Sequence, residues 1–124
     1  MVIGVAERGD VCIVRIEGRF VTGVDPVYLQ AKLDELKLLS RGSVLVDLQE
    51  MSYVGSTGLG FIVGIFTSVV RNSGKFVVTG LQPQVRNVFD LTRISTIIPS
   101  AADLESGLAA LGSVQSAGAA DASV

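Results

Sequence analysis

Residues 44–64, VLVDLQEMSYVGSTGLGFIVG, decide the fold of this 124-residue chain. The stretch begins with a short apolar run, continues through a loop with two adjacent hydroxyls, Ser56 and Thr57, and ends in a segment compatible with a helix. Residues 51–70 carry no charge at all. Two hydroxyls in such apolar surroundings need an explanation, either structural or functional.

The uncharged run has the length of a membrane-spanning helix, for which about 20 mostly apolar residues are needed. Gly60 and Gly64 even form the G-x-x-x-G spacing found where membrane helices pack together. The first half of the run is turn-like, however, because glycines flank Ser56 and Thr57 there. Only residues 59–70 are continuously compatible with a helix, and a segment this short predicts a buried core helix.

Composition predicts one globular domain and argues against nucleic acid as a partner. The chain has 48% hydrophobic residues and a net charge of -2, with no cluster of Lys and Arg that could follow a phosphate backbone. The single cysteine, Cys12, excludes a disulfide within the chain and is expected to be a buried, unreactive thiol. The N-terminus lacks the basic flank and apolar core of a signal peptide, so we expect a cytoplasmic protein.

Short apolar runs bounded by turn residues predict the strands of a sheet. The first two runs are separated by a short loop with Gly9, which predicts a hairpin of antiparallel neighbours. The later two are uniformly apolar, as is typical of strands covered on both faces. The expected strands are residues 2–7, 11–17, 43–48 and 75–80, with a brief extended piece at residues 97–99.

Capping residues and apolar spacing predict four helices. Asp25 before Pro26 is a typical helix start, Gln82 before Pro83 is another, and Ser100 is expected to cap the last helix with Asp103 completing an acidic capping box. The expected helices begin at Pro26, Ser56, Pro83 and after Ser100, and end at Gly42, about Asn72, Leu91 and Leu111. The residues expected to face the core are Leu29, Leu33 and Leu36 in the first helix, Leu59, Ile62, Val63, Phe66 and Val70 in the second, and Leu104, Leu108 and Leu111 in the last.

This element order predicts a single α/β domain over residues 1–111, a mixed four- to five-stranded sheet with about four helices packed on it. From Gly112 the composition shifts to small and polar residues, GSVQSAGAADASV. Such a segment cannot bury enough apolar surface to offset its ordering entropy. We therefore expect residues 112–124 to be a disordered tail.

Several residues of the central stretch have a structural interpretation. Ser56 follows a strand and its loop and begins the helix, where its hydroxyl can cap the first free amides. Gly60 and Gly64, one helical turn apart, are expected to let the helix lie close to the sheet or to a neighbouring helix. Asp47 at the strand end can accept hydrogen bonds from loop amides. The glycines around Gly58 do not indicate a phosphate-binding loop, because no Lys accompanies them.

The chain lacks the residue types of a catalytic or metal site. It has no His, the commonest general base, and no Ser-x-x-Lys pair or clustered pair of acids stands out. A metal site would need His or a second Cys. We therefore expect no enzyme activity, no metal and no cofactor.

The opening stretch resembles the signature of the STAS domain as found in bacterial anti-sigma-factor antagonists. In that family a strand ending in Asp-Leu leads to a phosphorylated serine, a second hydroxyl residue and a Gly-Leu-Gly turn at a helix start. The matching residues are Asp47 and Leu48 at the strand end, Ser56 at the phosphorylated serine, Thr57 beside it, and Gly58, Leu59 and Gly60 in the turn. The element order and IEGRF, residues 16–20, extend the resemblance over roughly residues 1–111.

The resemblance implies a partner switch. An unmodified antagonist of this family binds an anti-sigma factor of the serine-kinase type and thereby frees a sigma factor. Phosphorylation of the serine, here Ser56, releases the anti-sigma factor, and a serine phosphatase resets the cycle. A monomer or a weak dimer is expected, without membrane insertion. The implied partner-binding residues are Gly55, Ser56, Thr57, Gly58 and Leu59, with Val21, Thr22 and Val24 in the loop after the second strand.

Two positions depart from the family's pattern. An acidic residue usually precedes the phosphorylated serine, where this chain has Gly55, and another usually stands in the loop after the second strand, where it has Val21. We interpret Asp25, four residues later, as a helix cap in preference to a replacement for the missing acid. Two interpretations stay open. One is a phosphorylated antagonist, whose kinase either dispenses with these acids or acts poorly. The other is a STAS module that binds a partner or an apolar ligand without being phosphorylated, as in scaffold or lipid-transport assemblies.

Overall fold

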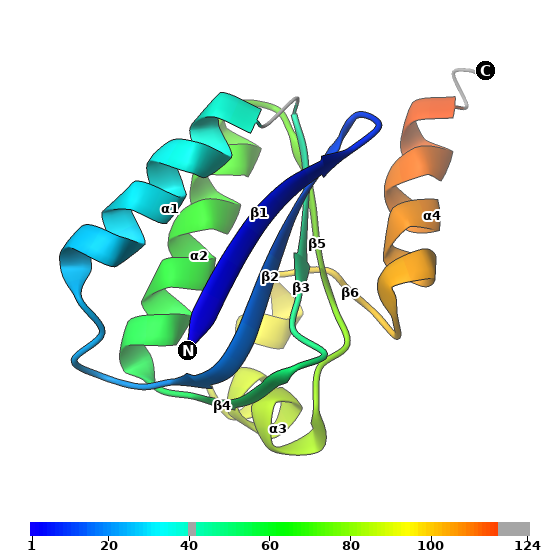
Figure 1. Cartoon of the computed structure of the whole chain (residues 1–124). Helices are drawn as coiled ribbons and strands as arrows, with labels where there is room; N and C mark the ends of the chain where they lie inside the picture. Colours follow the sequence, from blue (N-terminus) through cyan, green and yellow to red (C-terminus); the bar gives the residue numbers. More distant parts are fainter. Residues whose placement is uncertain (40–41, 117–124) are drawn as a thin grey trace.

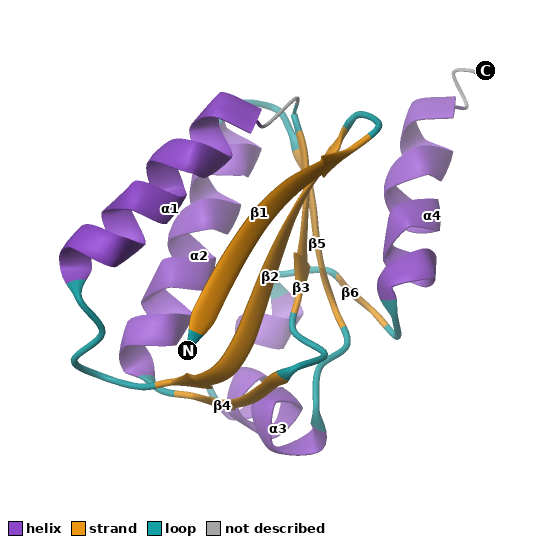
Figure 2. Ribbon diagram, in the orientation of Figure 1, coloured by secondary structure: helices purple, strands orange, loops and turns teal. Residues whose placement is uncertain are grey.

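The computed structural model describes residues 1–39 and 42–116, which form an α/β domain with helices on both faces of a mixed sheet (Figure 1; Figure 2). The strands are β1 (Val2–Arg8), β2 (Val11–Phe20), β3 (Ser43–Asp47), β4 (Met51–Val54), β5 (Lys75–Thr79) and β6 (Ser100–Ala101). The helices are α1 (Pro26–Leu39), α2 (Ser56–Arg71), α3 (Pro83–Leu91) and α4 (Leu104–Ser116), with a 3-10 turn at Ile94–Thr96. Helices α1 and α2 cover one face and α4 the other, whereas α3 lies beside β4 at one end.

The sheet has the order β1-β2-β3-β5-β6, and β4 pairs with β2 off this path. Strands β1 and β2 form the predicted antiparallel hairpin. Strands β2, β3 and β5 run parallel, so that Val14, Val46 and Val78 lie in register across the sheet. All five residues of β3 are buried, as predicted for a strand covered on both faces. The predicted α/β class is therefore confirmed.

Alternation along the central strands separates two hydrophobic cores. Val44 and Val46 of β3 belong to the larger core beneath α1 and α2, whereas Leu45 belongs to a smaller core beneath α4. Gly107 lets α4 lie close to the sheet, because a Cβ there would be 2.9 Å from Cδ1 of Leu45. The leucines predicted to face the core from the last helix all contact this smaller core: Leu104, Leu108 and Leu111.

Helix α1 follows its prediction. It begins at Pro26, and the Asp25 carboxylate caps it by accepting a hydrogen bond of 2.9 Å from the N–H of Val27. The Tyr28 hydroxyl accepts a 2.9 Å hydrogen bond from the N–H of Ile3, which ties the helix to the edge strand β1. The predicted core residues Leu29, Leu33 and Leu36 all pack in the larger core. Asp25 is thus confirmed as a helix cap.

Two short strands were not predicted correctly. Strand β4 lies in a stretch that we predicted to be a loop, and it pairs in parallel with the end of β2. Strand β6 occupies Ser100–Ala101 instead of residues 97–99, and it pairs with Val78 and Thr79 of β5. Strands of two to four residues show no periodic pattern in the sequence, and their positions depend on pairing with distant residues.

The start of α4 corrects the predicted cap. Ser100 is held in β6 by pairing with β5, which keeps it extended and away from the helix start. Asp103 is the cap instead, because its carboxylate accepts a hydrogen bond of 2.8 Å from the N–H of Ser106. The same hydrogen bond holds the pKa of Asp103 below its usual value.

The buried face of α2 also differs from the prediction. Val70 was expected in the core and is 50% exposed, whereas Phe61 and Ile65 were not expected there and are buried. Apolar residues surround most of this helix, so spacing alone cannot choose which face is buried. Gly58 fixes the buried face, because its lack of a side chain lets this side of the helix lie against β2 and β4. The buried residues are Gly58, Phe61, Ile62 and Ile65, and Leu59, Val63 and Phe66 are partly buried.

Cys12 is fully buried in β2, as predicted. Burial raises the pKa of its thiol to about 11, with the charges of Glu7 and Glu35 adding to the effect. The thiol is therefore protonated at neutral pH, where only the thiolate is a good nucleophile. This environment explains an unreactive, structural cysteine.

Helix α4 continues to Ser116, and residues 117–124 lie outside the described residues. The predicted domain boundary after Leu111 and the predicted disordered tail therefore stay predictions. Within the two described ranges, no helix is both long enough and apolar enough to cross a membrane.

Candidate functional site

The candidate site lies where β2 ends and α2 begins. Strand β4 runs parallel to the end of β2, with Val54 opposite Phe20. The N–H of Gly55 then donates a hydrogen bond of 2.8 Å to the carbonyl of Phe20. The loop that follows Phe20 is therefore held beside the first turn of α2. This arrangement joins the residues that precede Val21 and Ser56, although these two lie more than thirty positions apart in the chain.

Ser56 is the first residue of α2 and not its cap, which corrects the structural role predicted for it. Gly55 occupies the cap position in an extended conformation, and no side chain caps this helix end. The Ser56 side chain is exposed. The first amides of a helix have no carbonyl acceptor within it, and they lie at the positive end of its dipole. The serine hydroxyl therefore projects from a helix end that favours negative charge.

The first turn of α2 is packed tightly against β2 and β4. Gly58 is buried, and a Cβ at this position would lie 2.7 Å from both Cγ of Phe20 and Cγ2 of Val54. One turn later the Phe61 ring packs against the Phe20 ring, with centroids 5.5 Å apart. Any side chain at Gly58 would push the helix away from the sheet. Ser56 thus lies on a helical turn whose position is fixed by packing against β2 and β4.

The other predicted partner-binding residues differ in exposure. Val21, Thr22 and Ser56 are exposed, whereas Gly58 faces the core. Val24 is half-buried and packs against the larger core, so it anchors the loop. The residues of intermediate exposure are Val24, Gly55, Thr57 and Leu59. The exposed residues of the predicted partner-binding set are therefore Ser56 and the two at the tip of the loop, Val21 and Thr22.

Arg19 and Tyr53 border this surface and were missed by the sequence analysis. The Arg19 guanidinium lies over the Tyr53 ring at 4.7 Å from its centroid. Tyr53 is 40% exposed, and its ring lies 3.6 Å from the place of a Cβ at Gly55. In β4 the side chain of Val54 is buried, whereas that of Tyr53 is exposed, and this assignment depends on the pairing of β4 with β2. Without a prediction of β4, Tyr53 had no assigned face.

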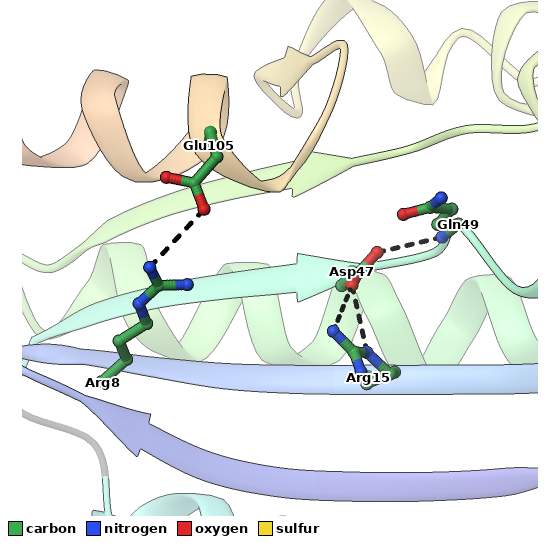
Figure 3. Close-up of polar contacts among 5 residues, drawn as sticks. All are labelled: Arg8, Arg15, Asp47, Gln49 and Glu105. Atoms are coloured by element: carbon green, nitrogen blue, oxygen red, sulfur yellow. Dashed lines mark hydrogen bonds and ion pairs between the residues drawn. The ribbon is translucent and has the colours of Figure 1, made fainter.

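Asp47 is a structural carboxylate at the end of β3, as predicted. Its Oδ1 accepts a hydrogen bond of 3.0 Å from the N–H of Gln49 in the following loop (Figure 3). Its Oδ2 accepts from Nε of Arg15 at 3.1 Å and lies 3.1 Å from Nη2. Asp47 is only 3% exposed, so the Arg15 guanidinium compensates a buried charge. The pairing with Arg15 on β2 was not predicted.

An exposed ion pair links the β1–β2 hairpin to α4. Nη2 of Arg8 lies 3.5 Å from Oε2 of Glu105 (Figure 3). Both side chains are largely exposed, so the pair adds little stability. Among residues 1–39 and 42–116, no three side chains of a type that binds metals gather at one place.

Gly60 and Gly64 do not have the predicted role of bringing α2 close to another element. Both are exposed, and a Cβ at either position would meet no atom within 4 Å. They face a groove of about 580 Å³ between α1 and α2. The prediction failed because the same spacing of glycines suits either a close contact or an open surface.

Comparison with known proteins places the chain in a family and confirms its fold. Residues 3–107 match the family model of the STAS domain. An anti-sigma-B factor antagonist of Listeria monocytogenes is 37% identical over 83 residues, which cover 64% of this chain and 73% of that relative. An anti-sigma factor antagonist from Mycobacterium paratuberculosis has a TM-score of 0.78 at 21% identity, covering 90% of this chain and 93% of that one. The phosphorylated form of SpoIIAA, a Bacillus cell fate determinant, has a TM-score of 0.60 at 15% identity, covering 82% of this chain and 92% of that one.

Proposed function

This chain belongs to the STAS domain family, and we propose that it works as an anti-sigma-factor antagonist by partner switching at Ser56. In the unmodified state it binds an anti-sigma factor of the serine-kinase type in the cytoplasm. Phosphorylation of Ser56 by that kinase releases the complex, and a serine phosphatase restores the binding state. The protein itself supplies a surface and a hydroxyl, and no catalytic group.

The observation that carries this proposal is the exposed hydroxyl of Ser56 at the first position of a rigidly packed helix. A phosphate on this oxygen meets the free amides of the first turn and the positive end of the helix dipole. Gly58 and Phe20 hold that turn from beneath, and neither is at the surface. We therefore expect phosphorylation to leave the fold intact and to change only the surface.

The surface around Ser56 suits a partner that recognises the neutral state. Val21 and Tyr53 are exposed apolar or aromatic side chains on the two segments that meet at Gly55, and such residues are typical interface anchors. A phosphate adds about -1.5 to -2 charges at the centre of this surface. An interface fitted to a neutral serine would have to bury or repel that charge, at a cost of several kcal/mol.

Gly55 is one of the two positions where the chain departs from the family's pattern, and the structure has room for a side chain there. A Cβ at Gly55 would lie 3.6 Å from the Phe20 carbonyl oxygen and from the Tyr53 ring, which is ordinary contact. Aspartate is also a favoured residue at the cap position that Gly55 occupies. We therefore infer that Gly55→Asp restores the missing acid without disturbing the fold.

The kinase experiment compares Gly55→Asp with the parent protein, using Ser56→Ala as the blank and the cognate anti-sigma factor with ATP. A carboxylate beside the serine can help to position Mg²⁺ or the attacking hydroxyl, which glycine cannot do. We expect slow phosphate incorporation in the parent and faster incorporation in Gly55→Asp. Equal and efficient incorporation in both would show that this chain is an ordinary, readily phosphorylated antagonist.

The binding experiment places one negative charge at two positions on the same helix. Ser56→Asp is expected to weaken binding of the anti-sigma factor roughly 100-fold, because an unmatched charge costs several kcal/mol at an interface. Thr67→Asp is the matched control, since Thr67 is also exposed on α2 but lies three turns further along. Circular dichroism should be unchanged in both variants. Equal affinities would move the interface away from Ser56.

A second candidate function is a STAS module that is not phosphorylated and binds a partner or ligand constitutively. The absence of acids at Val21 and Gly55 favours it. If the parent and Gly55→Asp both fail to accept phosphate while Ser56→Asp still weakens the complex, this candidate replaces the switch.

A further inference from the structure

A groove between α1 and α2 lies outside the Ser56 surface. The two helices run side by side on one face of the sheet (Figure 1). The groove has a volume of about 580 Å³, within the range of about 300–1,000 Å³ that is typical of small-molecule sites. The buried side chains that line it are apolar, namely Leu36, Phe61 and Ile65, and the exposed ones with polar groups are Lys37, Ser68 and Asn72.

The glycines that line this groove differ in what the fold requires of them. Gly74 is required, because a Cβ there would collide with the carbonyl oxygen of Gly42 and lie 2.8 Å from Cγ1 of Val69. Gly60 and Gly64 are not required, because a Cβ at either would meet nothing within 4 Å. Glycine inside a helix is destabilising by roughly 0.5–1 kcal/mol relative to alanine. Gly60 and Gly64 therefore cost stability without being required by a packing contact. Their effect is to leave the groove wider than alanine at these positions would.

The charge of the groove indicates the kind of ligand. Lys37 is the ionisable residue among the described lining residues, and no carboxylate lines the groove beside it. The ion pairs among the described residues do not include Lys37, whereas the neighbouring Lys32 is paired with Glu35. An apolar floor with one unpaired cation at its rim complements a molecule that has an apolar chain and an anionic head.

We propose that the α1–α2 groove binds an amphipathic anion. Its apolar chain lies over Phe61 and Ile65 in the space left open by Gly60 and Gly64, and its carboxylate or phosphate head pairs with Lys37. Leu33 and Leu36 form the opposite wall. This site goes beyond the proposed partner switch and does not depend on the phosphorylation of Ser56.

The shape of the groove argues against a partner helix as the occupant. An α-helix with its side chains is about 10–12 Å wide and rises 1.5 Å per residue. The groove volume of about 580 Å³ would therefore hold only about one turn of such a helix. The close contact of Gly74 with Gly42 bounds one end of the space. A slender chain fits such a space better than a second element of secondary structure.

The first experiment fills the groove. Dodecanoate, below its micelle concentration, is titrated into the full chain by calorimetry, and the parent is compared with Gly64→Ala and Gly60→Ala. Gly112→Ala is the matched control, because Gly112 is also helical and also faces open space, but on α4. We expect affinity to fall roughly tenfold or more in the groove variants and to be unchanged in the control. Unchanged affinity in Gly64→Ala and Gly60→Ala would overturn the proposal.

The second experiment varies the charge. Lys37→Glu is compared with Arg86→Glu, which makes the same change of charge on α3. Lys37→Glu should weaken dodecanoate binding and Arg86→Glu should not. Dodecanol should bind more weakly than dodecanoate or dodecyl phosphate, and the better of the two anions identifies the head group. Equal binding of dodecanol, equal effects of the two charge reversals, or no binding of any probe would contradict an anion site.

Discussion

At Gly58 the first turn of α2 is packed to contact distance against β2 and β4, whereas at Gly60 and Gly64 the same helix faces open space. The three glycines lie within seven residues of one helix, yet only Gly58 is required to lack a side chain by the atoms packed against it. The comparison teaches that a glycine's role depends on the face of the helix that bears it. The packed turn fixes the Ser56 surface, and the open turns leave room beside α1.

The largest expected effect tests the packed turn. Phe20 is fully buried and contacts both Gly58 and Phe61, so Phe20→Ala should destabilise the fold by about 3–5 kcal/mol, as is usual for a buried phenylalanine. Urea unfolding measures this loss. Tyr53→Ala on the outer face is the control and should cost much less. A loss below about 1 kcal/mol for Phe20→Ala would mean that the turn is not held from beneath.

Gly58→Ala should be the next largest change. The added methyl group would lie 2.7 Å from atoms of Phe20 and Val54, so the helix must shift, and overpacking of this kind costs about 1–3 kcal/mol. Combining it with Phe20→Ala sharpens the test. The methyl group should cost less when the Phe20 ring is absent, and additive losses would show that the two positions do not touch.

Gly64→Ala should have the opposite sign. Alanine in a helix is more stable than glycine by about 0.5–1 kcal/mol, and no atom near Gly64 opposes the methyl group. Thermal unfolding of Gly64→Ala and Gly60→Ala should therefore show higher melting temperatures than the parent. A lower melting temperature in either variant would place a neighbour in the space that the structure leaves open, and would break the contrast with Gly58.

Gly55→Asp should have the smallest effect, because it replaces one acceptable cap residue by a better one. The expected gain is a few tenths of a kcal/mol in the free energy of unfolding. Chemical denaturation of this variant, read together with its phosphorylation rate, separates stability from kinase recognition. A marked loss of stability would mean that the loop does not accept a side chain at this position, despite the free distances around it.

Much of the fold could be predicted from the sequence because its signals are local. The hairpin follows from two apolar runs and a short turn, and α1 follows from Asp25, Pro26 and its spaced leucines. Strand β4 could not be predicted, since four residues show no period and their position depends on pairing with β2. Ser100 was wrongly predicted to cap α4 for a similar reason. Its pairing with β5 is a long-range contact that leaves no local signal in the sequence.

The candidate site was predictable in part for the same reason. The motif around Ser56 assigned the serine to the helix start, but the capping role failed because Gly55 takes the cap position. The contact of Tyr53 with Arg19 could be predicted only if the pairing of β4 with β2 was known. The groove between α1 and α2 could not be predicted, because only the packing of two helices shows which side of Gly60 and Gly64 is open.

The most direct test of the proposed switch is to locate the phosphate and to measure its effect on binding of the anti-sigma factor. The full chain is incubated with its cognate anti-sigma factor and ATP, the phosphate is mapped by mass spectrometry, and the affinity of the modified protein is measured. The account predicts phosphate on Ser56, slow to accumulate, and an affinity reduced roughly 100-fold with the fold unchanged. Phosphate on Thr57 or elsewhere, or a phosphorylated Ser56 that binds as tightly as the free hydroxyl, would contradict it.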